Sequence, residues 1–175
     1  FSRFVNNQFS LISANLLTLN PRKPNFEVNY RVVEFISKIE GVFEVVPYIQ
    51  RGVSSQSLGR EETLVVMGLD HSKLPLIYPT LSVEEGAFVS ATDSSGILLG
   101  NGVAYSSTEG RVLASVGQTV KLRSTTFTGQ RPVARERTFI VRGILEPAGG
   151  SVIPVDSMAF ISTSAADAFF ERGGN

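Results

Sequence analysis

The apolar residues of this chain come in short runs that turn-forming residues interrupt, and this spacing limits its fold more than any other feature. After Asp70, the runs Gly96–Gly100, Thr119–Leu122 and Arg137–Leu145 are separated by clusters of Gly, Ser, Thr and Asp. Short apolar runs bounded by turn residues are typical of β-strands. All of them are far shorter than the ~20 apolar residues that a membrane-spanning helix needs. We therefore expect that no part of the chain crosses a bilayer.

The helical signals lie towards the two ends of the chain. Phe1–Ser13 and Asn29–Glu40 repeat apolar side chains at helical spacing, which predicts two amphipathic helices. In the second helix, Asn29 is suited to the N-cap and Gly41 to a left-handed C-cap. A closing helix is predicted at Ser164–Phe170, with its first serine as the N-cap.

The remaining segments are predicted to be strands and loops. The additional predicted strands are Asn15–Asn20, Val42–Ile49, Thr63–Leu69, Val152–Val155 and Met158–Ile161. Gly52–Glu62 is predicted to be a polar hairpin loop, and Tyr105–Val116 to hold one short helix. Ser124–Arg135 is predicted to be a long loop.

Length and composition indicate a folded α+β protein. The chain has 175 residues, of which 42% are hydrophobic and 18% charged, so it can close a hydrophobic core. The order of elements predicts a discontinuous α/β base subdomain from residues 1–72 and 148–175. A second, β-rich subdomain from residues 73–147 is predicted to be inserted into it.

Charge and cysteine content exclude several kinds of site. Sixteen basic and sixteen acidic residues give a net charge of zero, so no long-range field favours nucleic acid as a partner. The chain has no cysteine, which excludes disulfides, zinc–thiolate sites, iron–sulfur clusters and thiol nucleophiles. Since it begins at Phe1 without an initiator methionine, we expect it to be a piece of a longer protein.

His71 is the single histidine, and a Ser-His-acid triad or a histidine-based metal site would depend on it. It lies in Gly68–Ser72, where a predicted strand ends. A polar residue at such a turn is commonly an exposed, structural one. We therefore expect no catalytic role, and we expect His71→Ala to leave stability and activity nearly unchanged.

Three further motifs suggest sites, but each lacks a necessary part. Asp93-Ser94-Ser95-Gly96 lacks the alternating acidic ligands of a calcium loop. Glu84-Glu85-Gly86 has adjacent carboxylates that need not face a common substrate. Gly100-Asn101-Gly102 begins like a dinucleotide fingerprint, but the next glycine, Gly110, is too distant. The sequence thus predicts no catalytic, metal-binding or cofactor-binding residues and no cofactor, and it assigns no partner contacts.

A series of short strand and turn motifs runs along almost the whole chain. In order, these motifs are Ile39–Val42, Val45–Pro47, Val65–Asp70, Leu81–Gly86, Ile97–Gly100, Val103–Ala104, Val116–Val120 and Phe139–Ile144. Each motif is weak alone, but their order resembles the MacB-like periplasmic core domain of ABC transporter permeases. This class includes lipoprotein-releasing permeases and the FtsX-related family. The chain departs from the family at His71, where proline is frequent, and at Gln118, where aspartate is common.

The resemblance implies a domain on the extracytoplasmic face of the cell membrane, between the first two transmembrane helices of a permease. The domain would bind no ATP and catalyse nothing. It would couple helix motion, driven by a cytoplasmic ATPase, to export or to mechanical signalling. The implied partners are the permease's own transmembrane helices, the ATPase acting indirectly, a second permease copy, and an extracytoplasmic adaptor or cargo protein. Both chain ends would then lie together, close to the membrane.

Two other functions fit parts of the sequence. A free-standing extracellular ligand-binding or adhesion module would present the polar loops Gly52–Glu62 and Ser124–Arg135 as its surface. A small hydrolase would need a serine together with His71, and this one histidine would have to meet every requirement of a triad. Apolar segments of about 20 residues flanking the domain in the full-length gene would distinguish the permease domain from the free module.

Overall fold

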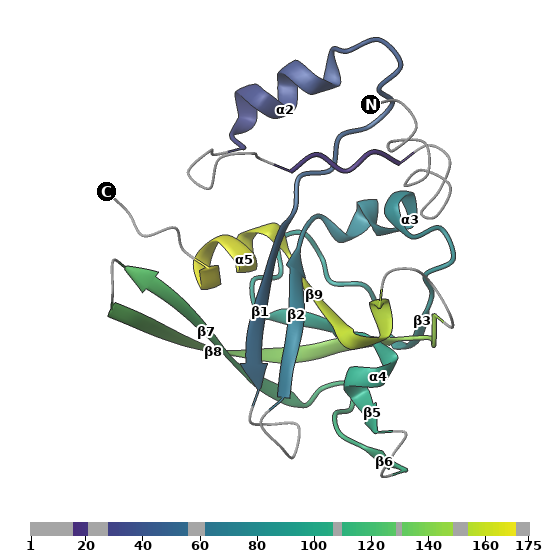
Figure 1. Ribbon diagram of the computed structural model, residues 1–175. Coiled ribbons are helices and arrows are strands. Elements are labelled where there is room, and N and C mark those ends of the chain that lie inside the picture. The colour runs from purple at the N-terminus through teal and green to yellow at the C-terminus, as the bar shows by residue number, and fades with distance from the viewer. Residues whose placement is uncertain are drawn as a thin grey trace, which may run out of the picture. The chain divides into compact units, whose positions relative to one another are not determined.

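The computed structural model describes residues 16–20, 28–55, 62–106, 110–128, 131–148 and 154–170 (Figure 1). The chain divides into two units, Phe1–Pro47 and Tyr48–Asn175. The predicted helix at Phe1–Ser13 and both chain ends lie outside the described residues. The expectation that the two ends lie together therefore stays a prediction.

The first unit contains the predicted second helix, α2 (Tyr30–Ser37). The Asn29 side chain accepts a hydrogen bond from the backbone N–H of Val32 at 3.2 Å, so this asparagine is the N-cap. Gly41 follows the helix with a φ of 88°, a left-handed conformation that suits glycine. The helix and its N-cap are confirmed. The predicted C-cap is wrong, because the helix ends at Ser37 with Lys38 as its C-cap, and Gly41 belongs to the turn that follows.

Two strand predictions near this helix are wrong. Residues 16–20 and 42–48 form no strand. The strand after the helix begins later, as β1 (Ile49–Ser55), and pairs antiparallel with β2 (Glu62–Gly68). Residues 52–55 and 62 of the predicted loop Gly52–Glu62 therefore belong to these two strands. Pro47, which has no backbone N–H, lies in the segment that stays out of the ladder.

The second unit is built on one mixed sheet that closes on itself. Its strands are β1, β2, β3 (Val83–Gly86), β4 (Gly96–Leu99), β7 (Thr119–Thr128), β8 (Arg131–Leu145) and β9 (Met158–Ile161). They are arranged in the order β3-β8-β4-β9-β2-β1-β7, and β7 pairs in turn with β8. All strands except β3 thus form a closed barrel, and β3 continues the sheet beyond β8. The α+β class is confirmed.

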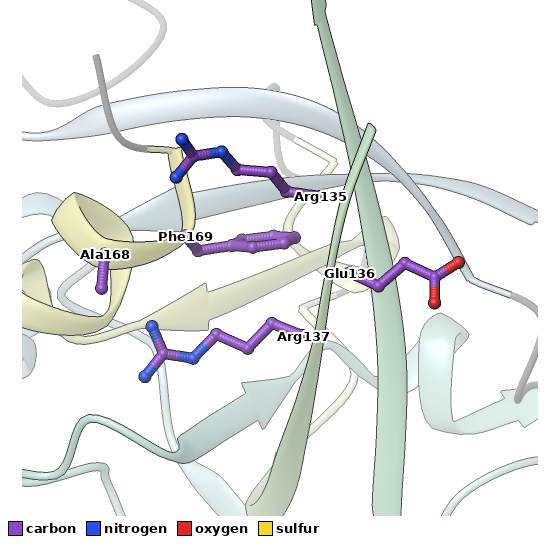
Figure 2. A pocket seen from close by; sticks show the side chains of 5 residues that line it. All are labelled: Arg135, Glu136, Arg137, Ala168 and Phe169. Atoms are coloured by element: carbon purple, nitrogen blue, oxygen red, sulfur yellow. The ribbon is translucent and has the colours of Figure 1, made fainter. Parts of the chain in front are cut away.

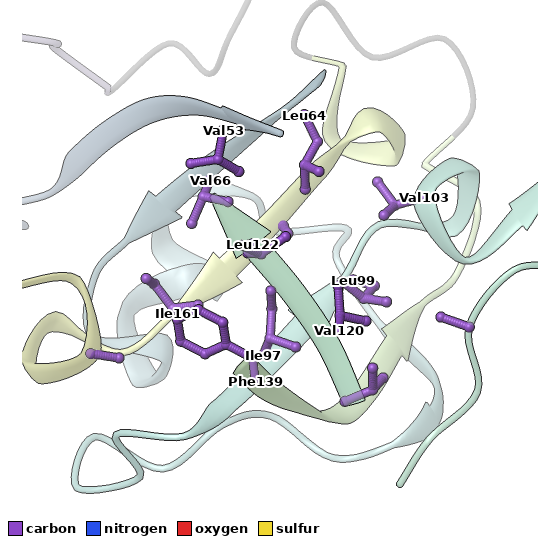
Figure 3. Close-up of a cluster of buried hydrophobic side chains, with 14 of the residues drawn as sticks. Val53, Leu64, Val66, Ile97, Leu99, Val103, Val120, Leu122, Phe139 and Ile161 are labelled. Carbon is purple, nitrogen blue, oxygen red and sulfur yellow. The ribbon is translucent and has the colours of Figure 1, made fainter. Parts of the chain in front are cut away.

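Alternating residues of these strands fill the barrel (Figure 3). Val66 of β2, Ile97 of β4 and Phe139 of β8 are fully buried inside it. Val120 and Ile161 lie in the same hydrophobic cluster. Since neighbouring residues of a strand face opposite sides, this clustering accounts for the register of each strand.

The outer faces of the central strands are buried as well. Leu98 of β4 and Phe160 of β9 are fully buried, although neither belongs to the cluster inside the barrel. The 3₁₀-helix η1 (His71–Lys73) and the short helix α3 (Leu74–Ile77) follow β2. Directly after α3, the Tyr78 ring packs edge-on against Phe160, with ring centroids 6.3 Å apart. The central strands therefore lie between two apolar layers.

Helix α5 (Thr163–Phe170) follows β9 and packs on β8 and β2. The predicted strand Met158–Ile161 and the closing helix are confirmed, but the predicted cap is wrong by two residues. The hydroxyl oxygen of Ser162 accepts from the backbone N–H of Ala165 at 3.2 Å, so Ser162 and not Ser164 caps this helix.

Two other predicted elements differ from the structure. The short helix α4 (Asn101–Ala104) lies before Tyr105, and the strands β5 (Tyr105–Ser106) and β6 (Arg111–Val112) pair in place of the predicted helix at Tyr105–Val116. In the predicted strand Val152–Val155, residues 152–153 lie outside the described part of the chain. Val155 begins the 3₁₀-helix η2 (Val155–Ser157).

The predicted long loop Ser124–Arg135 is wrong, because its described residues belong to β7 and β8. These strands pair without interruption from Thr119↔Ile140 to Thr128↔Arg131. Their outer part extends from the barrel as a two-stranded arm (Figure 1). One sheet thus takes strands from both predicted subdomains, and the division into residues 1–72 with 148–175 and residues 73–147 stays a prediction.

Phe139→Ala is expected to destabilise the second unit strongly. The Phe139 side chain is fully buried and packs edge-on against Phe169 at 5.5 Å between ring centroids. Its removal leaves a cavity, for which we expect a loss of roughly 3–5 kcal/mol in the free energy of unfolding. Urea denaturation measures this change. Val133→Ala, at an arm position that is 40% exposed, is the control and should change it by less than about 0.5 kcal/mol. Equal effects of the two variants would contradict the assigned core.

Candidate functional site

His71 is buried, and the expectation that it is exposed is wrong. Its side chain is 2% exposed, because η1 folds the histidine onto the sheet instead of leaving it at an open strand end. Its Nδ1 atom accepts a hydrogen bond from the backbone N–H of Val89 at 3.3 Å. No described hydroxyl donates to it. The environment is therefore that of a structural histidine and not of a triad base.

Burial lowers the pKa of His71 below its usual value of 6.5. The backbone carbonyl of Ile161 and the carboxylate of Asp70 oppose this effect only in part. The carbonyl of Ile161 already accepts from the backbone N–H of Leu69, and the Nε2 atom of His71 makes no well-aligned hydrogen bond within the described residues. The neutral ring is therefore the form that fits this site.

Asp93 stabilises the turn Asp93-Ser94-Ser95-Gly96, for which the sequence predicts no calcium site. Its Oδ1 atom accepts from the backbone N–H of Ser95 and of Gly96, both at 2.9 Å, and its Oδ2 atom accepts from Nε of Arg142 at 2.8 Å. Burial raises the pKa of Asp93, but the hydrogen bonds from Ser95 and the pairing with Arg142 outweigh this, so its pKa lies below the usual 3.8. Both carboxylate oxygens thus hold the protein together, and the turn interpretation is supported.

The two adjacent carboxylates of β3 contact different partners. Glu84 accepts from the side-chain amide of Asn101 at 3.0 Å, whereas Glu85 accepts from the hydroxyl of Tyr105 at 3.3 Å. These contacts attach β3 to α4 and β5. The described residues hold no group of three or more His, Cys, Asp or Glu side chains that could bind a metal ion.

The Gly100-Asn101-Gly102 motif is explained by close packing. A Cβ atom on Gly100 would lie 2.6 Å from the carbonyl oxygen of Asp156, and one on Gly102 would lie 3.0 Å from the same atom. The backbone N–H of Gly100 donates to the carbonyl of Met158 at 2.8 Å. The glycines therefore let the start of α4 approach η2, which accounts for the motif without a bound phosphate.

The surface feature that the sequence interpretation missed lies at the base of the arm. A hollow of about 310 Å³ lies at the surface beside β8 and α5, and it is lined by Arg135, Glu136, Arg137, Ala168 and Phe169. Figure 2 shows the side chains of Arg135 and Arg137 on either side of the Phe169 ring, both reaching towards α5. Glu136 points to the opposite side of the strand. Two arginines thus border one hollow.

Arg137 is held in place by the protein itself. Its guanidinium group donates to the carbonyl oxygens of Ala165 at 3.3 Å and Ser94 at 2.8 Å. Its Cζ atom also lies 5.5 Å from the ring centroid of Phe139, a cation–π distance. The signal that could have revealed this site is the alternation of Arg135, Arg137 and Phe139, which places the three side chains on one face of a strand.

The sequence matches the family described as the MacB-like periplasmic core domain over residues 1–175. The chain belongs to this family. The resemblance inferred from the order of its motifs is therefore confirmed, and with it the class of transporter permease domains that lie outside the cytoplasm. No helix in the described part of this MacB-like domain is long and apolar enough to span a membrane.

The fold of the MacB-like domain is also similar to that of a solved structure. The extracellular domain of the noncanonic ABC-type transporter YknZ from Gram-positive bacteria superimposes with a TM-score of 0.53, at 14% sequence identity. The match covers 80% of this chain and 65% of the YknZ chain, so this chain spans less than two thirds of that structure. No curated protein matches the sequence. At this identity the similarity concerns the fold alone.

The stability of the MacB-like domain is expected to fall as the pH drops from about 7.5 to about 5. Because burial lowers the pKa of His71 in the folded state, the unfolded chain binds a proton first as the pH falls through 6.5. Protonation therefore favours unfolding in this window. Urea denaturation at several pH values measures the slope.

The control for this prediction is His71→Leu, which fills the site with a side chain that does not titrate. The variant should lose the pH dependence in this window. Asp70 and Asp93, whose pKa values lie below 3.8, act only at lower pH. An unchanged slope in His71→Leu would show that another group causes the effect.

Proposed function

We propose that this chain is the extracytoplasmic domain of an ABC transporter permease and that it transmits movement without catalysing a reaction. The observation that carries the proposal is the family match over residues 1–175. The similarity in fold to the extracellular domain of an ABC-type transporter supports it. The driving energy would come from a cytoplasmic ATPase, acting through the permease's own transmembrane helices.

The buried barrel is suited to a mechanical role. Its central strands carry apolar layers on both faces, with Ile97 and Leu98 fully buried on opposite sides of β4. Close-packed interiors resist deformation and pass displacement on to their surroundings. A shift of the membrane helices would therefore move the barrel as one body, with export or a mechanical signal as the result.

The contacts of the candidate groups support the proposal that the domain catalyses no reaction. His71 faces a backbone amide inside the protein, both oxygens of Asp93 bind other parts of the chain, and Glu84 and Glu85 contact separate partners. Among the described residues, the hydroxyls of Ser95 and Tyr105 donate to Asp93 and Glu85, but neither is hydrogen-bonded to His71. The proposed partners are membrane helices of the same permease, a second permease copy, and an adaptor or cargo protein outside the membrane.

In the full-length gene product we expect an apolar segment of about 20 residues on each side of this domain. Such segments would anchor the domain to the bilayer, as the proposal requires. Sequencing the complete gene tests this directly. A secreted product without either segment would contradict the permease domain and favour a free-standing binding module.

Spin-label distances in the complete permease with its ATPase, in lipid, would test the mechanical role. The domain has no cysteine, so Arg51→Cys on β1 and Thr138→Cys on β8 would be the only labelled positions within it, and both are exposed. Cysteines elsewhere in the permease and its ATPase are replaced beforehand. We expect the distance between these two labels to stay constant when ATP binds, because the barrel moves as one body. The distance from Arg51→Cys to a label on a membrane helix should change.

Two results would contradict the mechanical role. A changed distance within the barrel would show that the barrel deforms and does not act as a rigid transmitter. Constant distances throughout the ATPase cycle would show that the domain takes no part in it.

A further inference from the structure

The outer half of β7 has one backbone edge that no described strand covers. On one side, β7 pairs with β8 along its whole length. On the other side, it pairs with β1 only through Leu122 and Arg123. Figure 1 shows the arm continuing beyond this contact, away from the barrel. In the described part of the chain, the last residues of β7 therefore form an open sheet edge.

The register shows which residues present their backbone groups at this edge. In an antiparallel strand, the N–H and C=O groups of successive residues point alternately to its two sides. The carbonyl of Gln118 accepts from the backbone N–H of Val141 on β8 at 2.9 Å. The carbonyl of Lys121 accepts from a hydroxyl of β1 at 3.2 Å. Even-numbered residues thus face β8, and the odd-numbered Thr125 and Phe127 present their backbone groups at the open edge.

The opposite edge of the arm is blocked at its tip by a proline. Pro132 of β8 lies opposite Phe127, at a position whose backbone faces away from β7, and it has no N–H to donate to a further strand. Sheet edges are commonly protected in this way, or by charged side chains. The segment Thr125–Thr128 contains neither proline nor charge. Of the two edges of the arm, β7 therefore presents the one that can accept a strand.

We propose that β7 pairs antiparallel with β7 of a second copy of this chain. The two-fold axis passes through Thr126, so that Thr125 of each copy lies opposite Phe127 of the other. Each such pair exchanges two backbone hydrogen bonds. Because Arg123 already pairs with β1, this is the register that uses both open residues of both copies. The two arms then form one continuous sheet with the strand order β8-β7-β7-β8.

A second copy suits this edge better than a different protein. A two-fold contact requires a surface that is complementary to itself. Two open residues on one strand, separated by a single residue, meet this condition because antiparallel pairing places one opposite the other. The segment Thr125–Thr128 carries no charge, so the two copies do not repel each other there. Thr126 opposite Thr126 of the second copy is a favourable cross-strand pair.

The pairing also explains how a two-stranded arm is supported. A ribbon of two strands is marginally stable alone, and further strands stabilise it. The contact is short, so we expect it to be weak between free domains and stronger where one membrane assembly holds two copies at a high effective concentration. The inference thus deepens the proposed function, on which it rests only for the place where the two copies meet.

Disulfide trapping on the 175-residue chain tests the pairing, because the chain has no cysteine of its own. Residue 126 meets its own copy in a pair without hydrogen bonds, in which the Cα atoms are about 4.5 Å apart. Disulfides accept separations of about 4.4–6.8 Å. Under mild oxidation at about 1 mM chain, similar to the effective concentration of a tethered pair, Thr126→Cys should form covalent dimers. We expect this to be at least about tenfold faster than for Thr125→Cys, since only residue 126 faces its own copy. Non-reducing electrophoresis measures both rates.

Thr125 provides matched controls. It is more exposed than Thr126, so random collisions would favour cross-linking of Thr125→Cys. Adding Thr125→Pro to Thr126→Cys removes an open-edge N–H but no bond to β8, and should slow cross-linking to the rate of Thr125→Cys. Adding Thr125→Ala keeps this N–H and should leave the rate nearly unchanged. Circular dichroism checks each fold, and the comparison of the two single cysteine variants stays valid if the proline variant does not fold.

Three outcomes would overturn the proposal. The first is equal cross-linking of Thr126→Cys and Thr125→Cys, which would indicate random collision. The second is a cross-linking rate that Thr125→Pro does not change in a folded variant. The third is absence of cross-linking, and binding of a labelled Thr-Val decapeptide would then assign the edge to a strand of another protein. All three leave the proposed function intact, because its tests are the flanking membrane segments and the spin-label distances.

Discussion

The rest of the structure depends on β7 closing the sheet. On one side this strand pairs with β8 over its whole length, and on the other it pairs with β1 at Ser54↔Arg123 and Ser55↔Leu122. Ser55 is fully buried at this seam, and its hydroxyl donates to the carbonyl of Lys121 at 3.2 Å. A buried hydroxyl without a partner would destabilise the seam, so this bond matters. Closure encloses the apolar cluster and brings β8 against α5.

The sequence was sufficient to predict elements whose signals are local. Asn29 caps the first turn of α2, and the apolar run Met158–Ile161 is buried on both faces as β9. The family was predictable for a related reason, since the order of the short motifs can be read from the sequence without knowing which motifs contact one another in the fold.

Features set by distant contacts could not be predicted in this way. The burial of His71 requires Val89, eighteen residues later, and the hollow requires α5 to lie beside β8. The polar composition of the arm predicts a loop. The hydrogen bonds of its two strands come from each other, and a segment that places Arg131, Val133, Arg135 and Arg137 on one face is as compatible with a strand as an apolar one is. The shift of β1 has the same origin, since polar Gln50 and Arg51 occupy its exposed positions.

The length of β8 determines how the sheet responds to a pulling force. One continuous backbone runs from the tip of the arm at Arg131 to Leu145, and along the way it is bonded to β7, then β4, then β3. A pulling force along β8 would load many interstrand hydrogen bonds at the same time, because these bonds lie across the direction of the force. They would have to break together and not one after another. The same arm pulled sideways at its tip would peel apart pair by pair. The arm is therefore stiff along its length and compliant when it is pulled sideways at its tip.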